Sequence, residues 1–412
     1  MDVMQPRVAG LDVHEAFVMV CRRLVRPDGQ VDKVVQRYST MTRDLLALSD
    51  WLAEAGVTHV AMESTGVFGK PIWNLLEAQF TIVLVNARHV KQVPGRKRDV
   101  SDAEWIAQLL QHGLLRASFV PPEPIRELRD LTRHRTTLVH ERTRVVNRIH
   151  KILEDANLKL SAVVTDIMGV SGRAMLRAIV AGETDPYQLA DLAQRRLRAK
   201  LPALAEALTG RVRPHHRLML TTLLDHVTFL EQQIAEYDGH IAQAVAPFAP
   251  ALTRLQTIPG VKGRTAENLL AEIGPDMSGF PSDRHLASWA ALCPGHDETG
   301  GKQRSGKTRK GNRWLRGVIT QAAWAAARTN GTYAQAQFRR LASRRGKKRA
   351  VVAVAHSLLI AVYHILRDDV PYHDLGADHF NRLTPHALTR SLVTRLQRLG
   401  YDVTLQPTNA VA

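Results

Sequence analysis

The sequence has few cysteines, and those present form no metal-ligand pattern. Cys21 and Cys293 are the two cysteines in a chain of 412 residues, and they lie far apart. Zinc ribbons and fingers need clustered cysteine or histidine ligands, so this class of site is not expected. Sparse cysteine of this kind is typical of proteins in a reducing cytosol.

The sequence also lacks a targeting segment and a long apolar run. The first residues, MDVMQPRVAGLDV, show no basic flank followed by an apolar stretch, so no signal peptide is expected. The longest apolar stretch, Val351–Leu366, falls short of the roughly 20 residues that a membrane span requires. It carries His356 and His364 and is predicted to be a buried helix. We therefore expect a cytoplasmic protein.

The chain is rich in positive charge. It has 56 Lys and Arg against 39 Asp and Glu, a net charge of +17. Such an excess favours nucleic acid or an acidic surface as partner over a small metabolite, although a basic surface without function would look the same. A hydrophobic content of 45% excludes wholesale disorder, and the length suits two or three domains.

Residues 1–118 alternate between strand and helix patterns. Three strand-like runs, 7–13, 16–25 and 31–39, are joined by tight turns and predict an antiparallel meander. A helix over 42–56, strands over 58–65 and 81–87 and helices over 70–79 and 101–113 follow. The pattern predicts an α/β domain with a mixed sheet, in the order of a ribonuclease H-like fold.

Residues 119–248 are predicted to be helical. Leu131, Leu138, Val145 and Ile152 recur every seven residues. A second seam alternates spacings of three and four: Leu220, Leu223, Val227, Leu230, Ile234, Tyr237 and Ile241. Either two antiparallel helices pack within one subunit, or the seam forms a dimerising coiled coil. The insert between the two arms, about 160–214, has no evident role.

Residues 249–375 form a third, mainly helical region, and a tail follows over 376–412. The stretch Leu255–Gly274 reads as helix, Pro-Gly-Val-Lys-Gly, helix, which resembles a helix–hairpin–helix. In such a turn Gly260, Lys262 and Gly263 would let backbone N–H groups approach a phosphate of a nucleic acid.

Four acids in the first region stand where a metal site would need them. Asp12 and Glu63 end strand-like runs, and Asp99 and Asp102 lie at a helix start, three residues apart. Carboxylate oxygens are the ligands that Mg²⁺ prefers, and a pair of such ions can promote phosphoryl transfer. A single acid such as Asp102 could instead serve only as a favourable charge at the start of a helix.

The chain resembles a known family, the DEDD transposases of the insertion sequence 110 family, which includes recombinases guided by a bridge RNA. The motifs GLDVHE, AMESTG and RDVSDA carry the resemblance in the first half. IPGVKGRTAENLLAEIG, the segment 280–317 and AWAAART carry it in the second. The resemblance implies a RuvC-like nuclease domain, a coiled-coil linker, a second catalytic domain, Mg²⁺, a tetramer built of dimers, and strand exchange between two DNA duplexes.

Carried over by position, Asp12, Glu63, Asp99 and Asp102 correspond to the four acids of the family. The second domain departs from the pattern, because the residue after Glu298 is Thr299 where the family commonly has a nucleophilic serine. Threonine keeps the hydroxyl but its methyl group restricts χ1. Thr299 is the expected nucleophile and Ser305 the fallback; Thr308, an inactive copy or an acid-only mechanism also remain open.

The hydroxyls lie in a strongly basic, glycine-rich stretch, Asp297–Gly317. The cations expected to neutralise phosphates are Lys302, Arg304, Lys307, Arg309, Lys310, Arg313 and Arg316. We expect this loop to bind a DNA phosphate that Thr299 attacks. Exchange through a covalent enzyme–DNA intermediate conserves bond energy and requires no ATP.

Two other functions fit parts of the sequence. A metal-only RuvC-like junction-resolving endonuclease would use the four acids and leave the hydroxyl loop without a role. A non-catalytic helix–hairpin–helix protein that binds nucleic acid would explain the charge but not four ordered acids. No motif for base readout is evident, as expected if a guide RNA selects the DNA sites by pairing.

Overall fold

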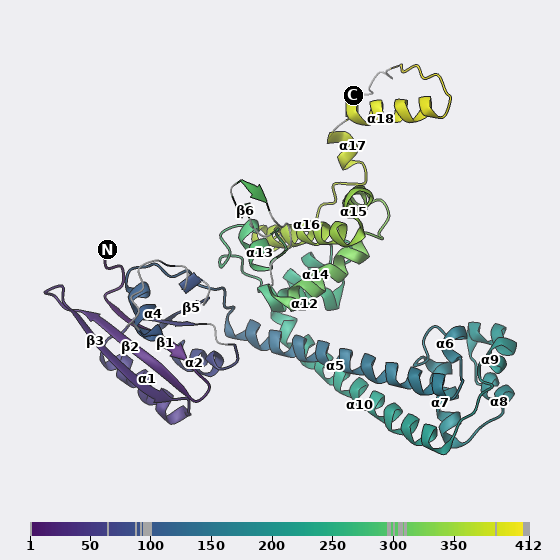
Figure 1. Cartoon of the computed structure of the whole chain (residues 1–412), viewed down its shortest axis with the longest axis horizontal. Helices are drawn as coiled ribbons and strands as arrows, with labels where there is room; N and C mark the ends of the chain where they lie inside the picture. The colour runs from purple at the N-terminus through teal and green to yellow at the C-terminus, as the bar shows by residue number, and fades with distance from the viewer. Residues whose placement is uncertain are drawn as a thin grey trace. The chain divides into compact units, whose positions relative to one another are not determined.

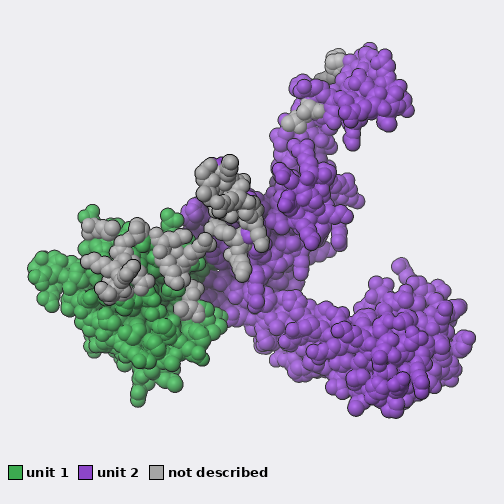
Figure 2. Space-filling model, in the orientation of Figure 1, with its two compact units in different colours: residues 1–120 green, residues 121–412 purple. Residues whose placement is uncertain are grey.

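The chain forms two compact units, residues 1–120 and 121–412 (Figure 2). The structure, a computed structural model, describes residues 2–63, 66–86, 89–90, 93, 101–294, 298–299, 301–303, 308, 311–383 and 385–406. For 298–299, 302–303 and Ala387 it describes the backbone alone. The finer division of the second unit expected from the sequence stays a prediction.

Unit 1 contains a mixed five-stranded sheet in the order β3-β2-β1-β4-β5 (Figure 1). β1 (Arg7–Val13), β2 (Phe17–Val25) and β3 (Val31–Ser39) form an antiparallel meander. β4 (His59–Glu63) runs parallel to β1, and β5 (Thr81–Val85) runs parallel to β4. The predicted antiparallel meander and mixed sheet are confirmed.

Both faces of this sheet are covered by helices. α1 (Thr42–Glu54) and α2 (Gly69–Leu76) pack on the face that presents Ala9, Leu11 and Val13. α4 (Asp102–Gln111) packs on the opposite face, against Val8 of β1, Ala61 of β4 and Val85 of β5. This alternation along β1 follows from the two-residue period of a strand.

Unit 2 begins with two long helices that lie side by side in opposite directions (Figure 1). α5 (Glu123–Asp155) and α10 (Pro214–Val245) are joined along their length by ion pairs between Arg135 and Asp238 and between Arg142 and Glu231. Leu220, Val227, Leu230 and Ile241 of the predicted seam are buried within this single chain. Of the two interpretations left open by the heptads, the structure supports the intramolecular helix pair.

The insert forms a small helical cap on the arms. It comprises α6 (Leu160–Val163), α7 (Val170–Ala181), α8 (Pro186–Asp191), the 3₁₀ helix η1 (Arg195–Lys200) and α9 (Leu201–Ala207). Its apolar residues share one core with Val145 and Ile149 of α5 and Leu220 of α10. The cap therefore closes the end of the helix pair where the chain reverses.

The rest of unit 2 is mainly helical. It contains η2 (Ala246–Phe248), α11 (Ala249–Leu255), α12 (Gly263–Ile273), α13 (Asp283–Trp289), a short hairpin of β6 (Glu298–Thr299) and β7 (Lys302–Gln303), α14 (Arg313–Ala326), α15 (Tyr333–Arg345), α16 (Lys347–Asp368), α17 (His379–Leu383) and α18 (Pro385–Arg398). A mixed sheet in the first part of the chain, followed by helices in the rest, is the order that the sequence predicted.

Helix α16 contains the longest apolar stretch of the sequence. Among the helices in the described ranges it alone is long and apolar enough to cross a membrane by length and composition. It packs against α13, α14 and α15 within unit 2, and Val354, Ala355, Leu359 and Val362 are fully or almost fully buried. The predicted core helix is confirmed.

Candidate functional site

Two of the predicted acids end neighbouring parallel strands of unit 1. β1 and β4 are in register from Val8 opposite His59 to Leu11 opposite Met62, so Asp12 and Glu63 come next on adjacent strands. Val8 and Ala61 belong to the core under α4. Because side chains alternate along a strand, Asp12 and Glu63 project to that same face.

The third described acid is brought to this face by a close helix–strand contact. Asp102 is the first residue of α4, and the Ser101 side chain caps the helix by accepting a hydrogen bond from the Glu104 N–H at 3.3 Å. A Cβ on Gly10 would lie 2.4 Å from the Ala103 carbonyl oxygen. Only glycine permits this approach of α4 to β1, two residues before Asp12. Asp99 lies outside the described residues.

The neighbours of these acids are polar on one side and apolar on the other. His14 Nε2 lies 3.2 Å from Asp12 Oδ2, and the Asp12 side chain is 22% exposed. Cys21 lies under α4, where burial raises the pKa of its thiol to about 11. Mg²⁺ prefers oxygen ligands, so the carboxylates of the acids suit it better than this thiol does.

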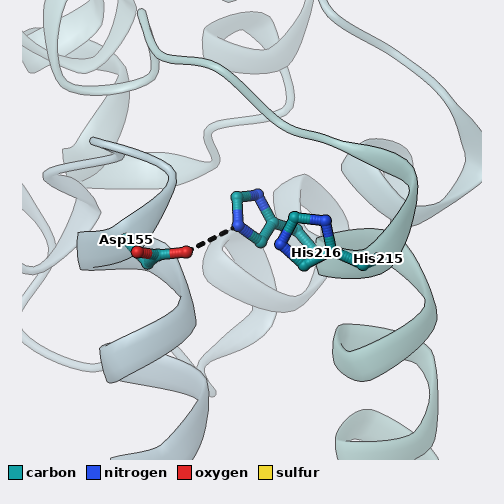
Figure 3. Close-up of side chains that lie close together, drawn as sticks. All are labelled: Asp155, His215 and His216. Carbon is teal, nitrogen blue, oxygen red and sulfur yellow. Dashed lines mark hydrogen bonds and ion pairs between the residues drawn. The ribbon is translucent and has the colours of Figure 1, made fainter.

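Within the described ranges, the one group of three or more possible metal ligands is Asp155, His215 and His216, whose ligand atoms all lie within 4.8 Å of one another (Figure 3). The Arg213 backbone N–H donates to His216 Nδ1 at 3.2 Å, and His216 Nε2 lies 2.8 Å from Asp155 Oδ2. Because Nδ1 accepts, the proton of a neutral ring is on Nε2 and donates to Asp155. If a metal bound Nε2, the ring proton would have to sit on Nδ1, where it would face the Arg213 N–H.

This cluster is therefore better explained as a contact that joins two helices. Asp155 ends α5 and His216 lies in the first turn of α10, so their hydrogen bond fixes the two helix ends across the insert. Metal-bound histidines normally donate their second N–H to an acceptor, which is the opposite of the arrangement here. No sequence pattern indicates this pair, since the residues are 61 positions apart.

The predicted helix–hairpin–helix turn joins α11 to α12. Gly260 has φ +84°, and a Cβ there would lie 2.5 Å from the Ala322 carbonyl oxygen of α14. Close packing on α14 therefore explains this glycine. Lys262 is exposed, and a Cβ on Gly263 would meet open space at the start of α12. Of the three predicted phosphate-binding residues, Lys262 is exposed and the two glycines are half-buried.

The hydroxyl loop is partly described. Thr299 pairs with Lys302 and Glu298 with Gln303 in the β6–β7 hairpin. Thr308 forms a backbone bridge with Pro294, and its hydroxyl accepts a hydrogen bond from Arg316 Nη2 at 3.2 Å. Arg304, Ser305, Lys307, Arg309 and Lys310 lie outside the described residues. The Thr308 hydroxyl therefore contacts Arg316, and its role as an alternative nucleophile stays a prediction.

One spacing in this loop has another known meaning. Residues 301–308, GKQRSGKT, match the GxxxxGK[ST] pattern of phosphate-binding P-loops. A P-loop leads directly into a helix, whereas Thr308 pairs in a bridge and α14 begins at Arg313. Gly301 lies instead in the turn between β6 and β7. The match lacks its structural context and does not indicate an ATP site.

The end of the loop is anchored by a buried carboxylate that sequence patterns did not identify. Asn312 caps α14 by accepting from the Trp314 and Leu315 N–H groups, and its Nδ2 donates to Glu272 Oε2. Arg133 of α5 donates two hydrogen bonds, of 2.7 and 2.8 Å, to the same Glu272 carboxylate, which is 3% exposed. The network ties the loop to α5 and α12.

A second basic surface lies at the turn between α15 and α16. We call it the α15–α16 cation cluster; its exposed members are Arg344, Arg345, Lys347, Lys348 and Arg349. None of them has an acidic partner within the part of the chain that the structure describes. Lys347 and Lys348 also occupy the first turn of α16, where the helix dipole disfavours cations. Uncompensated charge at this position is what an anionic partner would stabilise.

The two halves of the chain match two descriptions of the same family. A DEDD-type IS110 transposase model matches residues 9–158, and the model described as "Transposase IS116/IS110/IS902 family" matches residues 252–339. The acid face lies in the first match and the hydroxyl loop in the second.

Several curated proteins are similar over most of the chain. A probable family 20 transposase of Pseudomonas aeruginosa is 27% identical over 89% of this chain and 95% of its own length. The transposase for insertion sequence element IS1111A of Coxiella burnetii is 25% identical over 78% of this chain and 81% of its own. A pilin gene-inverting protein of Moraxella bovis is 29% identical over 36% of this chain and 48% of its own. With both halves matched in order, the chain belongs to the IS110 family of transposases, which cleave and recombine DNA.

Proposed function

We propose that this protein moves an insertion sequence by cleaving donor and target DNA and exchanging their strands through a covalent protein–DNA intermediate. The observation that carries the proposal is the alignment of Asp12 and Glu63 on adjacent parallel strands, with Asp102 beginning the helix on the same face. This arrangement is the reason to assign unit 1 a ribonuclease H-like, RuvC-like nuclease fold.

The donor set of this face fits a hard divalent cation. Membership of the DEDD transposases implies a divalent metal ion and a DNA substrate. Asp12, Glu63, Asp99 and Asp102 offer only carboxylate oxygens, which suits Mg²⁺ better than zinc or copper. When bound, the metal would stabilise charge on the phosphoryl group and on the oxygens that attack and leave.

In the second half, Thr299 is the proposed nucleophile and Ser305 the alternative. The Thr299 hydroxyl oxygen would form an ester with the phosphorus of the DNA strand, while the phosphorus–oxygen bond to the leaving sugar breaks. The hydroxyl proton would pass to a carboxylate base, and the leaving oxygen would take up a proton. Attack by a strand-end hydroxyl on the ester would then join the new strands and release Thr299.

The surfaces for nucleic acid are proposed on unit 2. Lys302, Arg304, Lys307, Arg309, Lys310 and Arg313 of the loop, with Gly260, Lys262 and Gly263 of a helix–hairpin–helix, would contact the DNA backbone. The α15–α16 cation cluster supports an extended contact, since none of its members has an acidic partner among the described residues. A bridge RNA from the element is proposed to select both DNA sites, consistent with the net charge of +17.

The assembly and the division of labour are also proposals. Residues 1–118 would form the nuclease domain, 119–248 the helical linker with its insert, 249–375 the second catalytic domain, and 376–412 a tail. A dimer or tetramer would bring together the two DNA duplexes at the bacterial nucleoid. Because the seam residues of α10 are buried within one chain, we propose that contacts between copies come from other surfaces.

The test is recombination in solution between donor and target duplexes, with and without RNA transcribed from the ends of the element. We expect Mg²⁺-dependent product with the RNA, none after chelation, and protein covalently joined to nicked DNA when reactions are stopped with detergent. Cleavage without any covalent complex would instead support the metal-only junction endonuclease. Binding without cleavage would support the non-catalytic nucleic-acid-binding protein.

A further inference from the structure

A cavity of about 140 Å³ in unit 2 is lined by residues of α5, α12 and α14. This is roughly ten times the volume that one water molecule requires, yet well below the size of a site for a drug-sized ligand. Its lining includes the Glu272–Arg133 ion pair and residues of α14, the helix that follows the Thr299 hairpin in the sequence. By its volume the cavity suits one small group.

Four polar side chains of the cavity lining can turn toward a ligand: His140, Arg313 and Gln321 are exposed, and Asn268 is half-buried. Asn268, Gln321, His140 and Arg313 line it, and none makes a side-chain hydrogen bond or ion pair to another described residue. Two amides offer both donors and acceptors, as the edge of a nucleobase requires. Arg313, with His140 beside the same cavity, offers donors to a phosphate.

One wall of the cavity is aromatic. Trp314 is half-buried, and the guanidinium carbons of Arg313 and Arg133 lie 4.9 and 5.8 Å from the centre of its ring system. Indole rings and guanidinium planes are the surfaces on which unpaired bases stack in complexes with single-stranded nucleic acid. A base would find a stacking surface here next to the amides.

Gly317 lines the cavity without a side chain of its own. Glycine is among the least favourable residues in the interior of a helix, yet it is the fifth residue of the 14-residue helix α14. A Cβ at this position would meet no atom within 4 Å, so close packing does not explain the glycine. It lines the cavity, and any side chain there would narrow it.

We infer that this cavity binds a single unpaired nucleotide, its base stacked at Trp314 and its phosphate held by Arg313. The inference rests on the proposed nucleic-acid substrate and names a contact within it. An unpaired nucleotide is what a strand presents when a duplex opens for exchange. Capture of one next to the hydroxyl loop would hold the opened strand near the proposed point of attack.

The experiment uses the full-length protein and short duplexes that carry one bulged 2-aminopurine, in DNA and in RNA, with fully paired duplexes for comparison. Fluorescence anisotropy gives the affinities, and the 2-aminopurine signal reports stacking. We expect tighter binding of a bulged duplex than of its paired counterpart, and a Trp314→Ala variant that loses this preference with affinity about 5- to 150-fold weaker. The DNA and RNA arms identify the source of the nucleotide.

A second variant guards against failure to fold. Gly317→Leu fills the cavity while it improves helix propensity, so we expect loss of the bulge preference together with a Tm raised by about 2–4 °C. Gly239→Leu is the matched control, because Gly239 lies within α10, where a Cβ would also meet open space. This control should raise Tm and keep the preference.

Equal affinity of the wild type for bulged and paired duplexes would overturn the inference, as would a Gly317→Leu protein that keeps the preference. Neither result would touch the covalent complex, so the proposed function would stand. Conversely, a bulge preference in a protein that forms no covalent complex would leave the nucleotide site in place and remove the proposed nucleophile.

Discussion

The acid face of unit 1 and the hydroxyl loop of unit 2 are held in place by different means. Asp12 and Glu63 are aligned by the backbone ladder of a parallel strand pair, which fixes register without help from their side chains. The hydroxyl loop is held at its ends, by the Pro294–Thr308 bridge and by Asn312 on Glu272. The acids therefore belong to a rigid framework, whereas the loop depends on a network that reaches into α5 and α12.

We expect the greatest loss of strand exchange from changes to the acid face of unit 1. Asp12→Ala should lower strand exchange by about 1000-fold or more, because a shared metal site loses one of its carboxylates. The sheet ladder is unaffected, so Tm and nucleic-acid affinity should stay close to the wild type. The measurement is product formation from labelled duplexes.

The matched control for Asp12→Ala is Asp32→Ala, which removes an exposed acid from the edge strand β3 of the same sheet. It should leave strand exchange unchanged. An Asp12→Ala enzyme with near-normal activity would take the acid face out of the mechanism.

The network that anchors the loop should respond in stability as well as in activity. Glu272→Ala leaves Arg133 without its partner in a largely buried position and should lower the free energy of unfolding by about 3–5 kcal/mol. Asn312→Ala removes the cap of α14 and should cost about 1 kcal/mol. Urea unfolding followed by circular dichroism measures both.

If the two residues act as one anchor, the double variant should lose less than the sum of the single losses. Strict additivity would show that Asn312 and Glu272 stabilise unit 2 independently, and the account of the loop anchor would be wrong.

A smaller effect is expected from the α15–α16 cation cluster. Replacing Arg344, Arg345, Lys347 and Lys348 by Gln should reduce the slope of log affinity against log salt by up to about 3.6, near 0.9 for each phosphate that is no longer neutralised. The control replaces four exposed cations that already have acidic partners: Arg26, Arg43, Lys159 and Arg198. An equal fall in slope for both sets would show that only total charge matters.

The sequence predicted the parts of the molecule that local patterns determine. Alternation and turn residues predicted the meander and a mixed sheet with Asp12 and Glu63 at strand ends, but the parallel pairing of their two strands is visible only in the structure. The heptads predicted α5 and α10 but left the partner of the seam open, because a buried stripe reads the same within a chain or between chains. Val227 is fully buried inside this chain, which resolves that ambiguity.

The contacts that sequence could not predict join distant residues. Arg133 and Glu272 are 139 positions apart. Glu272 lies in the motif IPGVKGRTAENLLAEIG, but nothing in that motif pairs it with Arg133. Gly260 was predicted to approach phosphate, but its position against α14 becomes visible only once the helices pack. No local pattern explains why residue 317 is a glycine, whereas the structure shows that Gly317 lines a cavity.

Attack of a loop hydroxyl on DNA can be tested by mass spectrometry of the protein–DNA complex trapped with detergent. We expect the DNA on Thr299, no adduct in Thr299→Val, and an adduct in Thr299→Ser that forms at least as fast, because loss of the methyl group frees χ1. DNA on Ser305, or a Thr299→Val enzyme that still forms the adduct, would contradict the account.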